Sequence, residues 1–294
     1  RPVSLRAVLV DTSEPRGRAI IVADESAAIY CTAESSLLGQ FNRGDLLKLT
    51  GVSDPGQFAP IVKLTKATKL GTAPLPEPQP TTYQEIISGA LDAQWVEVSG
   101  VIQQYLPAAP GSDIRRILLS LGGNVVHVRL TDPHNPGLKE DARIRVRALC
   151  FYQFNQKRQL LNAVLQVPAG APIIIEKAAP EHPYDAPVRP AASLLVFSPD
   201  NSQGHRVHMR GVVLHAQSQS TIWIRDDSAG LRLQTHTGAP VRPGDILDVL
   251  GFSKYGTATP VIEGAVYRVL GHTNPPAALP VNAVTNAFDF VDNL

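Results

Sequence analysis

One pattern recurs three times along this chain of 294 residues, at a spacing of about a hundred residues. It opens with a stretch in which apolar and polar residues alternate, and a small residue lies near the end of the stretch. The copies are residues 3–8, 96–101 and 207–212. A second shared stretch, a turn followed by an alternating run, lies at residues 43–51, 140–148 and 243–251. This period is far longer than that of solenoid or propeller repeats, and each unit is long enough to bury its own core. We predict three domains in series, at residues 1–80, 81–180 and 181–294.

Each unit carries the signals of about five short strands. Polar turns at residues 24–27 and 226–230 indicate hairpins between the second and third strands, because Asp and Gly tolerate the positive φ that such turns need. Gly44 and Gly244 introduce the fourth strand, and Asp141 takes this place in the middle copy. Five strands closing into a small barrel describe the OB-fold, whereas a β-sandwich array needs about seven per unit. The predicted fold is therefore all-β, three tandem OB-fold-like five-stranded barrels with short connecting helices.

Proline-rich joints separate the units, at residues 73–80, 169–190 and 274–280. Such joints are typical of stiff spacers. A short helix is predicted after each joint, at residues 82–91, 191–197 and 281–290, and Thr82 with Glu85 forms a capping signal for the first. No opening strand follows the third helix, and the chain does not begin with Met. We expect it to be a portion of a longer polypeptide.

Composition excludes several classes of function. The net charge of +1 supplies no global field that would steer the chain to nucleic acid or to an anionic membrane. Cys31 and Cys150 fall in different repeats, so buried free thiols are expected rather than a bridge. His205 and His208 face opposite sides if their segment is a strand, which argues against a metal site. No nucleophile elbow or phosphate loop is present. We expect no metal, no cofactor and no enzymatic activity.

The third copy offers the strongest candidate for ligand binding. If the aliphatic residues of its second and third strands fill the barrel, Trp223, Arg225, Arg232 and Gln234 share the outer face. A Trp flanked by guanidinium groups suits stacking on a planar or anionic ligand. The alternative is that Trp223 packs under a neighbouring domain or a proline joint. The first copy has less polar residues at the corresponding positions, Ile21, Ala23 and Tyr30, so the third domain is favoured.

The loops after the fourth strands carry aromatic residues, and the middle one also carries two basic residues. This secondary candidate consists of Phe151, Tyr152, Phe154, Lys157 and Arg158. Interleaved aromatic and basic residues form stacking platforms in single-strand-binding OB domains. The other role for these rings is to cap the barrel ends or to form domain contacts, which we favour because nucleic-acid binders usually show a stronger basic balance. Arg143, Arg145 and Arg147 share one face of a strand and indicate a solvated surface.

Three segments, residues 91–101, 187–195 and 204–213, together with the joints, resemble the periplasmic OB-like repeat regions of bacterial membrane-bound sensor histidine kinases and, occasionally, of diguanylate cyclases. The resemblance covers essentially the whole chain but rests on a diffuse pattern. It implies the extracytoplasmic portion of an inner-membrane protein, with a membrane helix and a cytoplasmic output module downstream, in a two-component system.

Three functions compete on these observations. The first is a non-catalytic periplasmic sensor domain that binds a small molecule or a protein signal, which the resemblance favours. The second is a single-stranded nucleic-acid-binding OB-fold array, and the third is a structural spacer. We expect the sensor function and do not expect nucleic acid as a partner.

Overall fold

The computed structural model describes residues 1–12, 18–107, 114–131, 136–157, 159–194, 204–218, 220–236, 238–255 and 260–277. The chain divides into two compact units. The first contains residues 1–100, 105–138 and 143–177, and the second contains residues 101–104, 139–142 and 178–294. The domain boundaries expected at residues 80 and 180 stay predictions.

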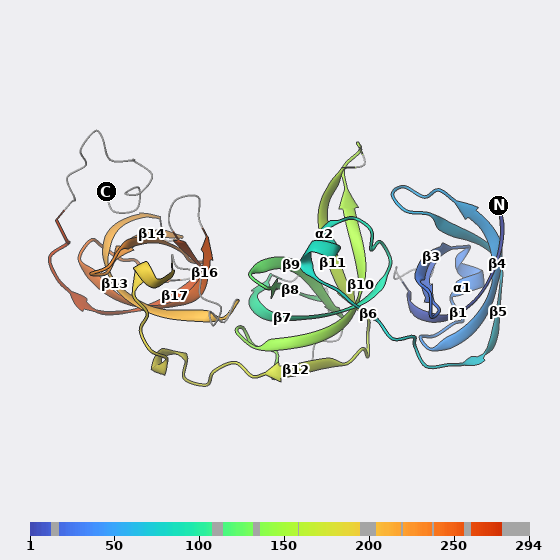
Figure 1. Cartoon of the computed structure of the whole chain (residues 1–294), viewed down its shortest axis with the longest axis horizontal. Helices are drawn as coiled ribbons and strands as arrows, with labels where there is room; N and C mark the ends of the chain where they lie inside the picture. Colours follow the sequence, from blue (N-terminus) through green and yellow to red (C-terminus); the bar gives the residue numbers. More distant parts are fainter. Residues whose placement is uncertain are drawn as a thin grey trace. The chain divides into compact units, whose positions relative to one another are not determined.

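The first barrel is closed by five strands in the order β1-β2-β3-β5-β4, and β4 pairs back with β1. All neighbouring strands are antiparallel except β3 and β5, which pair in parallel at Cys31 and Val62. Figure 1 shows these strands, in blue, curling into a ring. A short helix, α1, connects β3 to β4. The bounds are β1 Pro2–Thr12, β2 Ala19–Ala23, β3 Ala28–Thr32, α1 Ser35–Leu38, β4 Asp45–Asp54 and β5 Ile61–Thr72.

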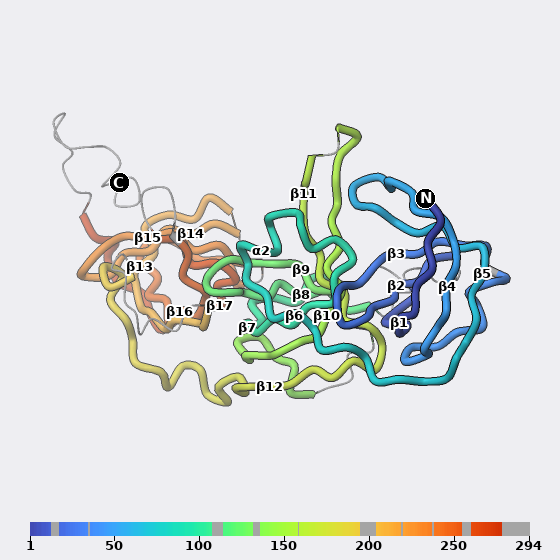
Figure 2. The backbone as a smooth tube through the Cα atoms, turned by 45° about the vertical axis from the view of Figure 1, so that its right-hand side comes forward, coloured from blue at the N-terminus to red at the C-terminus, as the bar shows by residue number. Residues whose placement is uncertain are grey.

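The middle barrel has the same order, β7-β8-β9-β11-β10, and closes where β10 pairs with β7. Two short strands that the sequence did not indicate extend it, because β6 pairs with β7 and β12 pairs with β10. The β10–β11 hairpin projects beyond the barrel in Figures 1 and 2. The bounds are β6 Gln79–Pro80, α2 Tyr83–Ile87, β7 Trp95–Leu106, β8 Ile114–Leu121, β9 Asn124–Thr131, β10 Arg143–Phe154, β11 Leu160–Val167 and β12 Ile173–Lys177.

The third barrel repeats the order as β13-β14-β15-β17-β16 and is again closed. Two single-turn 3-10 helices, η1 and η2, precede it. The bounds are η1 Pro183–Asp185, η2 Ala191–Leu194, β13 Arg206–Ser218, β14 Thr221–Arg225, β15 Gly230–Gln234, β16 Asp245–Tyr255 and β17 Pro260–His272. The chain is thus all-β and contains three OB-fold-like barrels in tandem, as the repeat predicted.

Alternation along the strands decides which side chains fill each barrel. In the third barrel Ile222, Ile224, Leu231 and Leu233 are at most 1% exposed and pack into one core cluster. The first barrel has its own cluster, which includes Leu9, Ile20, Val22, Cys31 and Leu47. Successive strand residues point to opposite sides of a sheet, so the residues between these apolar positions face outward.

The turn residues adopt the conformations that their sequence predicts. Gly44 and Gly244 have φ values of 87° and 93°, and Asp141, which replaces them in the middle copy, has a φ of 73°. In the third barrel Asp226 accepts hydrogen bonds from the backbone of Ser228 at 2.7 Å and of Ala229 at 2.8 Å. Asp24 makes the corresponding bonds in the first barrel. By accepting these backbone hydrogen bonds, the two carboxylates stabilise the hairpin turns.

The first connecting helix is shorter than predicted. The first, α2, has the expected capping box between Thr82 and Glu85, but it ends at Ile87 instead of residue 91. Ser88 is its C-cap, and Gly89 then has a φ of 83°, which turns the chain out of the helix. The described part of the second predicted helix, residues 191–194, forms η2, and the third predicted helix lies outside the described residues. Cys31 and Cys150 are buried free thiols, as expected. In the described part of the chain no helix is long and apolar enough to cross a membrane.

Candidate functional site

The four predicted ligand-binding residues do share one outer face of the third barrel. Trp223 on β14 is directly opposite Arg232 on β15, and Thr221 is opposite Gln234. Arg225 lies two residues after Trp223, on the same side of β14, and all four are partly exposed. The intervening Ile222 and Leu233 point into the core. This arrangement, which we call the β14–β15 face, presents one indole ring between guanidinium groups.

His215 on β13 extends the β14–β15 face and was not found from the sequence. It pairs with Trp223 in the register of β13 and β14, and the two ring centroids lie 5.5 Å apart with the planes inclined at 36°. Two register shifts interrupt this pair of strands, between Val213 and His215 and between Ala216 and Ser218. Counting alternate residues along β13 therefore could not have placed the imidazole beside the indole.

The positive charge of the face is not neutralised by described residues of the protein. Neither Arg225 nor Arg232 forms an ion pair with any residue that the structure describes, in contrast to Arg210 and Arg268 nearby. The Nε atom of Arg232 is enclosed and has no hydrogen-bond partner there. Arg225 also lines a hollow of about 810 Å³, whose lining includes Arg189, Asp226 and Asp227. The face can therefore offer two guanidinium groups to an anionic ligand.

Arg210 and Arg268 instead form ion pairs with a buried carboxylate of the same barrel, that of Asp248. Asp248 is fully buried and accepts hydrogen bonds from Arg210 Nε at 2.8 Å, Arg268 Nη2 at 2.6 Å and His208 Nε2 at 2.7 Å. Burial acts to raise the pKa of Asp248, but the bonds from Arg210, His208 and Arg268 outweigh it and lower the pKa to about 2. The other ring nitrogen of His208 lies 2.6 Å from the backbone oxygen of Ala186. These contacts give His208 a structural role, and the described residues contain no group of three potential metal ligands.

The equivalent face of the first barrel is covered by the protein itself. Ile21 and Ala23 on β2 and Ala28 on β3 are buried in a cluster with Trp95 and Leu149 of the middle barrel. The side chain of Gln94 fastens this contact, because it donates to Ala28 O at 2.8 Å and accepts from Ala28 N at 3.0 Å. The apolar character of this face in the sequence thus reflects a contact within the first unit.

The equivalent face of the middle barrel carries basic residues that the sequence reading passed over. Arg116 on β8 is directly opposite Arg129 on β9, and His127 lies two residues before Arg129 on the same side. Like charges in opposite positions are unfavourable. The Nη2 atom of Arg116 bonds the backbone oxygen of Pro107. Neither β8 nor β9 contains a Trp, Tyr or Phe, so His127 supplies the one aromatic ring on these two strands.

The secondary candidate loop serves contacts within the first unit. Tyr152 is buried, and its hydroxyl donates to Ile86 O at 2.7 Å and accepts from Leu91 N at 3.1 Å. Phe154 stacks on Phe58 of the first barrel with ring centroids 4.7 Å apart, and Phe151 packs against the cluster around Trp95. Lys157 is exposed, and Arg158 lies outside the described residues. The three rings therefore serve contacts within the first unit, and Lys157 does not share their burial.

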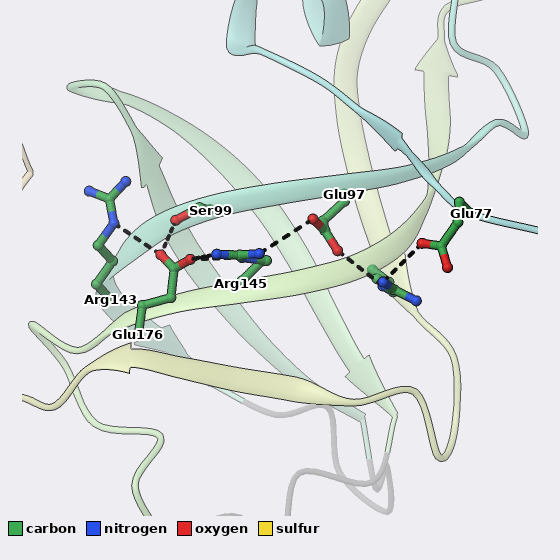
Figure 3. Close-up of polar contacts among 7 residues, drawn as sticks. Glu77, Glu97, Ser99, Arg143, Arg145 and Glu176 are labelled. Carbon is green, nitrogen blue, oxygen red and sulfur yellow. Dashed lines mark hydrogen bonds and ion pairs between the residues drawn. The ribbon is translucent and has the colours of Figure 1, made fainter.

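Arg143, Arg145 and Arg147 lie on one face of β10, as predicted, and carboxylates compensate all three. Glu176 on β12 pairs with Arg143 at 3.2 Å and with Arg145 at 2.6 Å. Glu97 on β7 pairs with Arg147 at 3.0 Å, and the row continues to Glu77 (Figure 3). The alternation of arginine and glutamate leaves no net charge for an anion.

Comparison with known proteins gives similarities of fold only. No protein-family model and no curated protein matches this chain. Among solved structures it is similar to a murine DNA-binding protein bound to double-stranded DNA, at 12% identity and a TM-score of 0.32, over 61% of this chain and 97% of that one. It is similar to the Ifi202 HINa domain in complex with 20-bp double-stranded DNA (11%, TM-score 0.29, 60% and 96%) and to the p204 HINb domain (9%, TM-score 0.29, 59% and 96%).

These matches contradict two of our expectations. None of the three structures is a sensor kinase, and two of them contain DNA, so we withdraw both the periplasmic sensor function and the expectation that nucleic acid is not a partner. The resemblance on which the sensor function rested stays a prediction. TM-scores of 0.32 or less say nothing about what this chain binds, and a functional proposal has to rest on its own side chains.

Proposed function

We propose that this chain binds single-stranded nucleic acid on the β14–β15 face of its third barrel. One observation carries the proposal. His215, Trp223 and Arg232 stand in a row across three neighbouring strands, β13, β14 and β15. Neighbouring strands lie about 4.8 Å apart, so the row spans about 10 Å. This length suits one stacked base and the phosphate beside it.

The chemistry of the row favours a single strand over a duplex. An indole ring binds a base by stacking on its π-face, and such stacking tolerates any base. In a duplex both faces of each base are already covered by its neighbours, whereas an unpaired base can be stacked on a side chain. Arg225 and Arg232 flank the indole and provide cations for the backbone phosphates.

The neutral composition of the chain is compatible with this function. With a net charge of +1, the chain as a whole does not attract a polyanion over long distances. The guanidinium groups of Arg225 and Arg232 nevertheless form no ion pair with any described residue, in contrast to that of Arg210. We therefore expect binding of modest affinity that depends on local contacts and weakens as salt increases.

A titration of fluorescently labelled oligonucleotides tests the proposal. The wild-type chain is expected to bind single-stranded DNA or RNA at low salt more tightly than the same sequence as a duplex. Stacking on an aromatic residue contributes about 1–3 kcal/mol per base, so Trp223→Ala should weaken binding by a factor of about 5 to 150.

Trp223→Phe is the matched control, because it keeps a ring at the same position, and it should retain most of the affinity. Absence of single-strand binding by the wild-type chain would contradict the proposal. Equal affinity of the wild-type and Trp223→Ala chains would move the interface away from this face.

A further inference from the structure

The first unit contains a cavity of about 630 Å³ with aromatic walls, remote in sequence from the β14–β15 face. Its lining comes from the loop between β4 and β5, from the turn before β7 and from the end of β10. Five aromatic residues contribute to it, namely Tyr30, Phe58, Phe151, Tyr152 and Phe154. The volume is in the range of sites for small organic ligands, which are typically apolar with a few polar groups.

Contacts among the rings and with the backbone hold the aromatic lining in place. Phe58 stacks on Phe154, with planes 16° apart, and meets Tyr152 edge to face at a centroid distance of 5.6 Å. The hydroxyl of Tyr152 is fixed by the backbone of Ile86 and Leu91. Rings anchored in this way cannot collapse into the space between them, so the cavity is preformed and a ligand would lose little free energy in ordering it.

Asp92 adds a carboxylate to this aromatic lining. Burial raises the pKa of Asp92 above its ordinary value, and the nearby backbone N–H groups of Tyr152 and Ala93 act against this rise. No cationic side chain of the described residues pairs with it. Lys63 also lines the cavity, but its ammonium group is 2.5 Å from the carboxylate of Asp54. The lining therefore carries one negative charge in excess.

The backbone beside Asp92 is also unusual. Ala93 has a φ of 58°, one of two positive values among the described residues other than glycine. Such a conformation costs an alanine of the order of 1–2 kcal/mol and persists only where the surroundings enforce it. Here Ala93 N donates to Cys150 O at 2.8 Å, which fixes the turn that presents Asp92.

We propose that this cavity binds a small organic cation, an alkylated ammonium ion, with its charge toward Asp92 and its alkyl groups against the rings of Phe58, Phe151 and Phe154. Aromatic faces carry negative potential and attract cations, most strongly those with a weakly hydrated charge. An anion would meet both the carboxylate and the ring faces, and a neutral ligand would leave the charge of Asp92 without a partner. This inference does not depend on the proposed nucleic-acid binding.

Calorimetric titration of the whole chain with choline tests the inference, and 3,3-dimethylbutan-1-ol serves as the neutral probe of the same shape. We expect choline to bind and the alcohol to bind at least about tenfold more weakly. Asp92→Asn should lower the choline affinity about tenfold or more, because the amide keeps the shape and removes the charge. Phe154→Leu should lower it by a factor of about 2 to 30.

Glu34→Gln is the matched control, since it removes an exposed carboxylate of the same unit that does not line the cavity, and it should bind choline like the wild-type chain. Absence of choline binding, equal binding of the alcohol, or an unchanged affinity in Asp92→Asn would each overturn the proposal. If Asp92→Asn does not fold, Phe154→Leu decides, and an unchanged choline affinity in that variant would overturn it too.

Discussion

Replacing Arg225 with glutamine changes the salt dependence of nucleic-acid binding if the β14–β15 face holds backbone phosphates. Each phosphate that a side chain neutralises releases bound counterions, and for a single strand it contributes about −0.7 to the slope of log K against log salt concentration. The face offers two guanidinium groups, Arg225 and Arg232, that no described carboxylate neutralises. The expected slope is therefore about −1.4 for the wild-type chain and about −0.7 for Arg225→Gln.

The difference is large enough to measure by fluorescence anisotropy with a labelled single-stranded oligonucleotide. Between 50 and 200 mM salt, a slope of about −1.4 lowers the affinity about sevenfold, whereas a slope of about −0.7 lowers it about threefold. The loss of affinity in Arg225→Gln should accordingly be greatest at the lowest salt concentration and should shrink as salt is added.

Arg6→Gln is the control for the change in net charge. Arg6 is exposed on β1 of the first barrel and takes no part in the β14–β15 face. If both variants lower the slope equally, the effect comes from overall charge and the reasoning from this face fails. An unchanged slope in Arg225→Gln refutes it as well.

Three further predictions concern stability. Asp248→Asn should lower the free energy of unfolding of the second unit by about 3–5 kcal/mol in urea titrations, because Arg210, Arg268 and His208 lose their buried carboxylate partner. Because the pKa of Asp248 is lowered to about 2, its carboxylate contributes fully to the free energy of unfolding above the unfolded pKa of about 4, and this contribution is lost as the pH falls from 4 to 2. The wild-type chain should therefore lose more stability over this range than Asp248→Asn, and an equal loss in the two chains would contradict the prediction. Gly51→Ala should lower the melting temperature of the first unit by an amount equivalent to about 1–3 kcal/mol, since its Cβ would overlap the backbone oxygen of Lys63. Gly271→Ala, whose Cβ would meet no atom within 4 Å, should leave the melting temperature of the second unit unchanged. Glu176→Gln should cost only about 1 kcal/mol in the same melting experiment, because the arginines that it pairs with are nearly half exposed, and a much larger loss would show that the row of ion pairs acts as a cooperative network.

The features that local sequence governs were predicted well. Apolar alternation identified the strands that begin at Trp95 and Arg206, and Asp141 was recognised as a substitute for the turn glycines. Predictions that depended on where an element stops were less accurate, as α2 shows, because its end is set by Ser88 and the left-handed Gly89. The strands β8 and β9 were not located, although their two-residue turn at Gly122 and Gly123 is a hairpin signal.

The candidate binding face was likewise predicted only in part from the sequence. That Trp223 and Arg232 face outward follows from the alternation of β14 and β15, and the sequence was sufficient for it. That His215 joins them depends on two bulges in β13, which shift the register by local backbone geometry rather than by residue type. The sequence correctly indicated that the outer face of the third barrel is a better candidate for ligand binding than that of the first. The reason is a tertiary contact, because Ile21 of the first barrel is buried in a cluster with Trp95.

The sequence by itself determined three closed barrels and the inward or outward direction of most strand residues, because both depend on alternation and turn chemistry within a few residues. Only the tertiary structure decided which outward faces stay accessible. The face of the first barrel is covered through contacts such as that between Ala28 and Gln94, 66 residues apart. The cavity that Asp92 lines likewise depends on a contact between Phe58 and Phe154, which are distant in the sequence. Contacts at such separations depend on how whole barrels pack, and no local pattern encodes them.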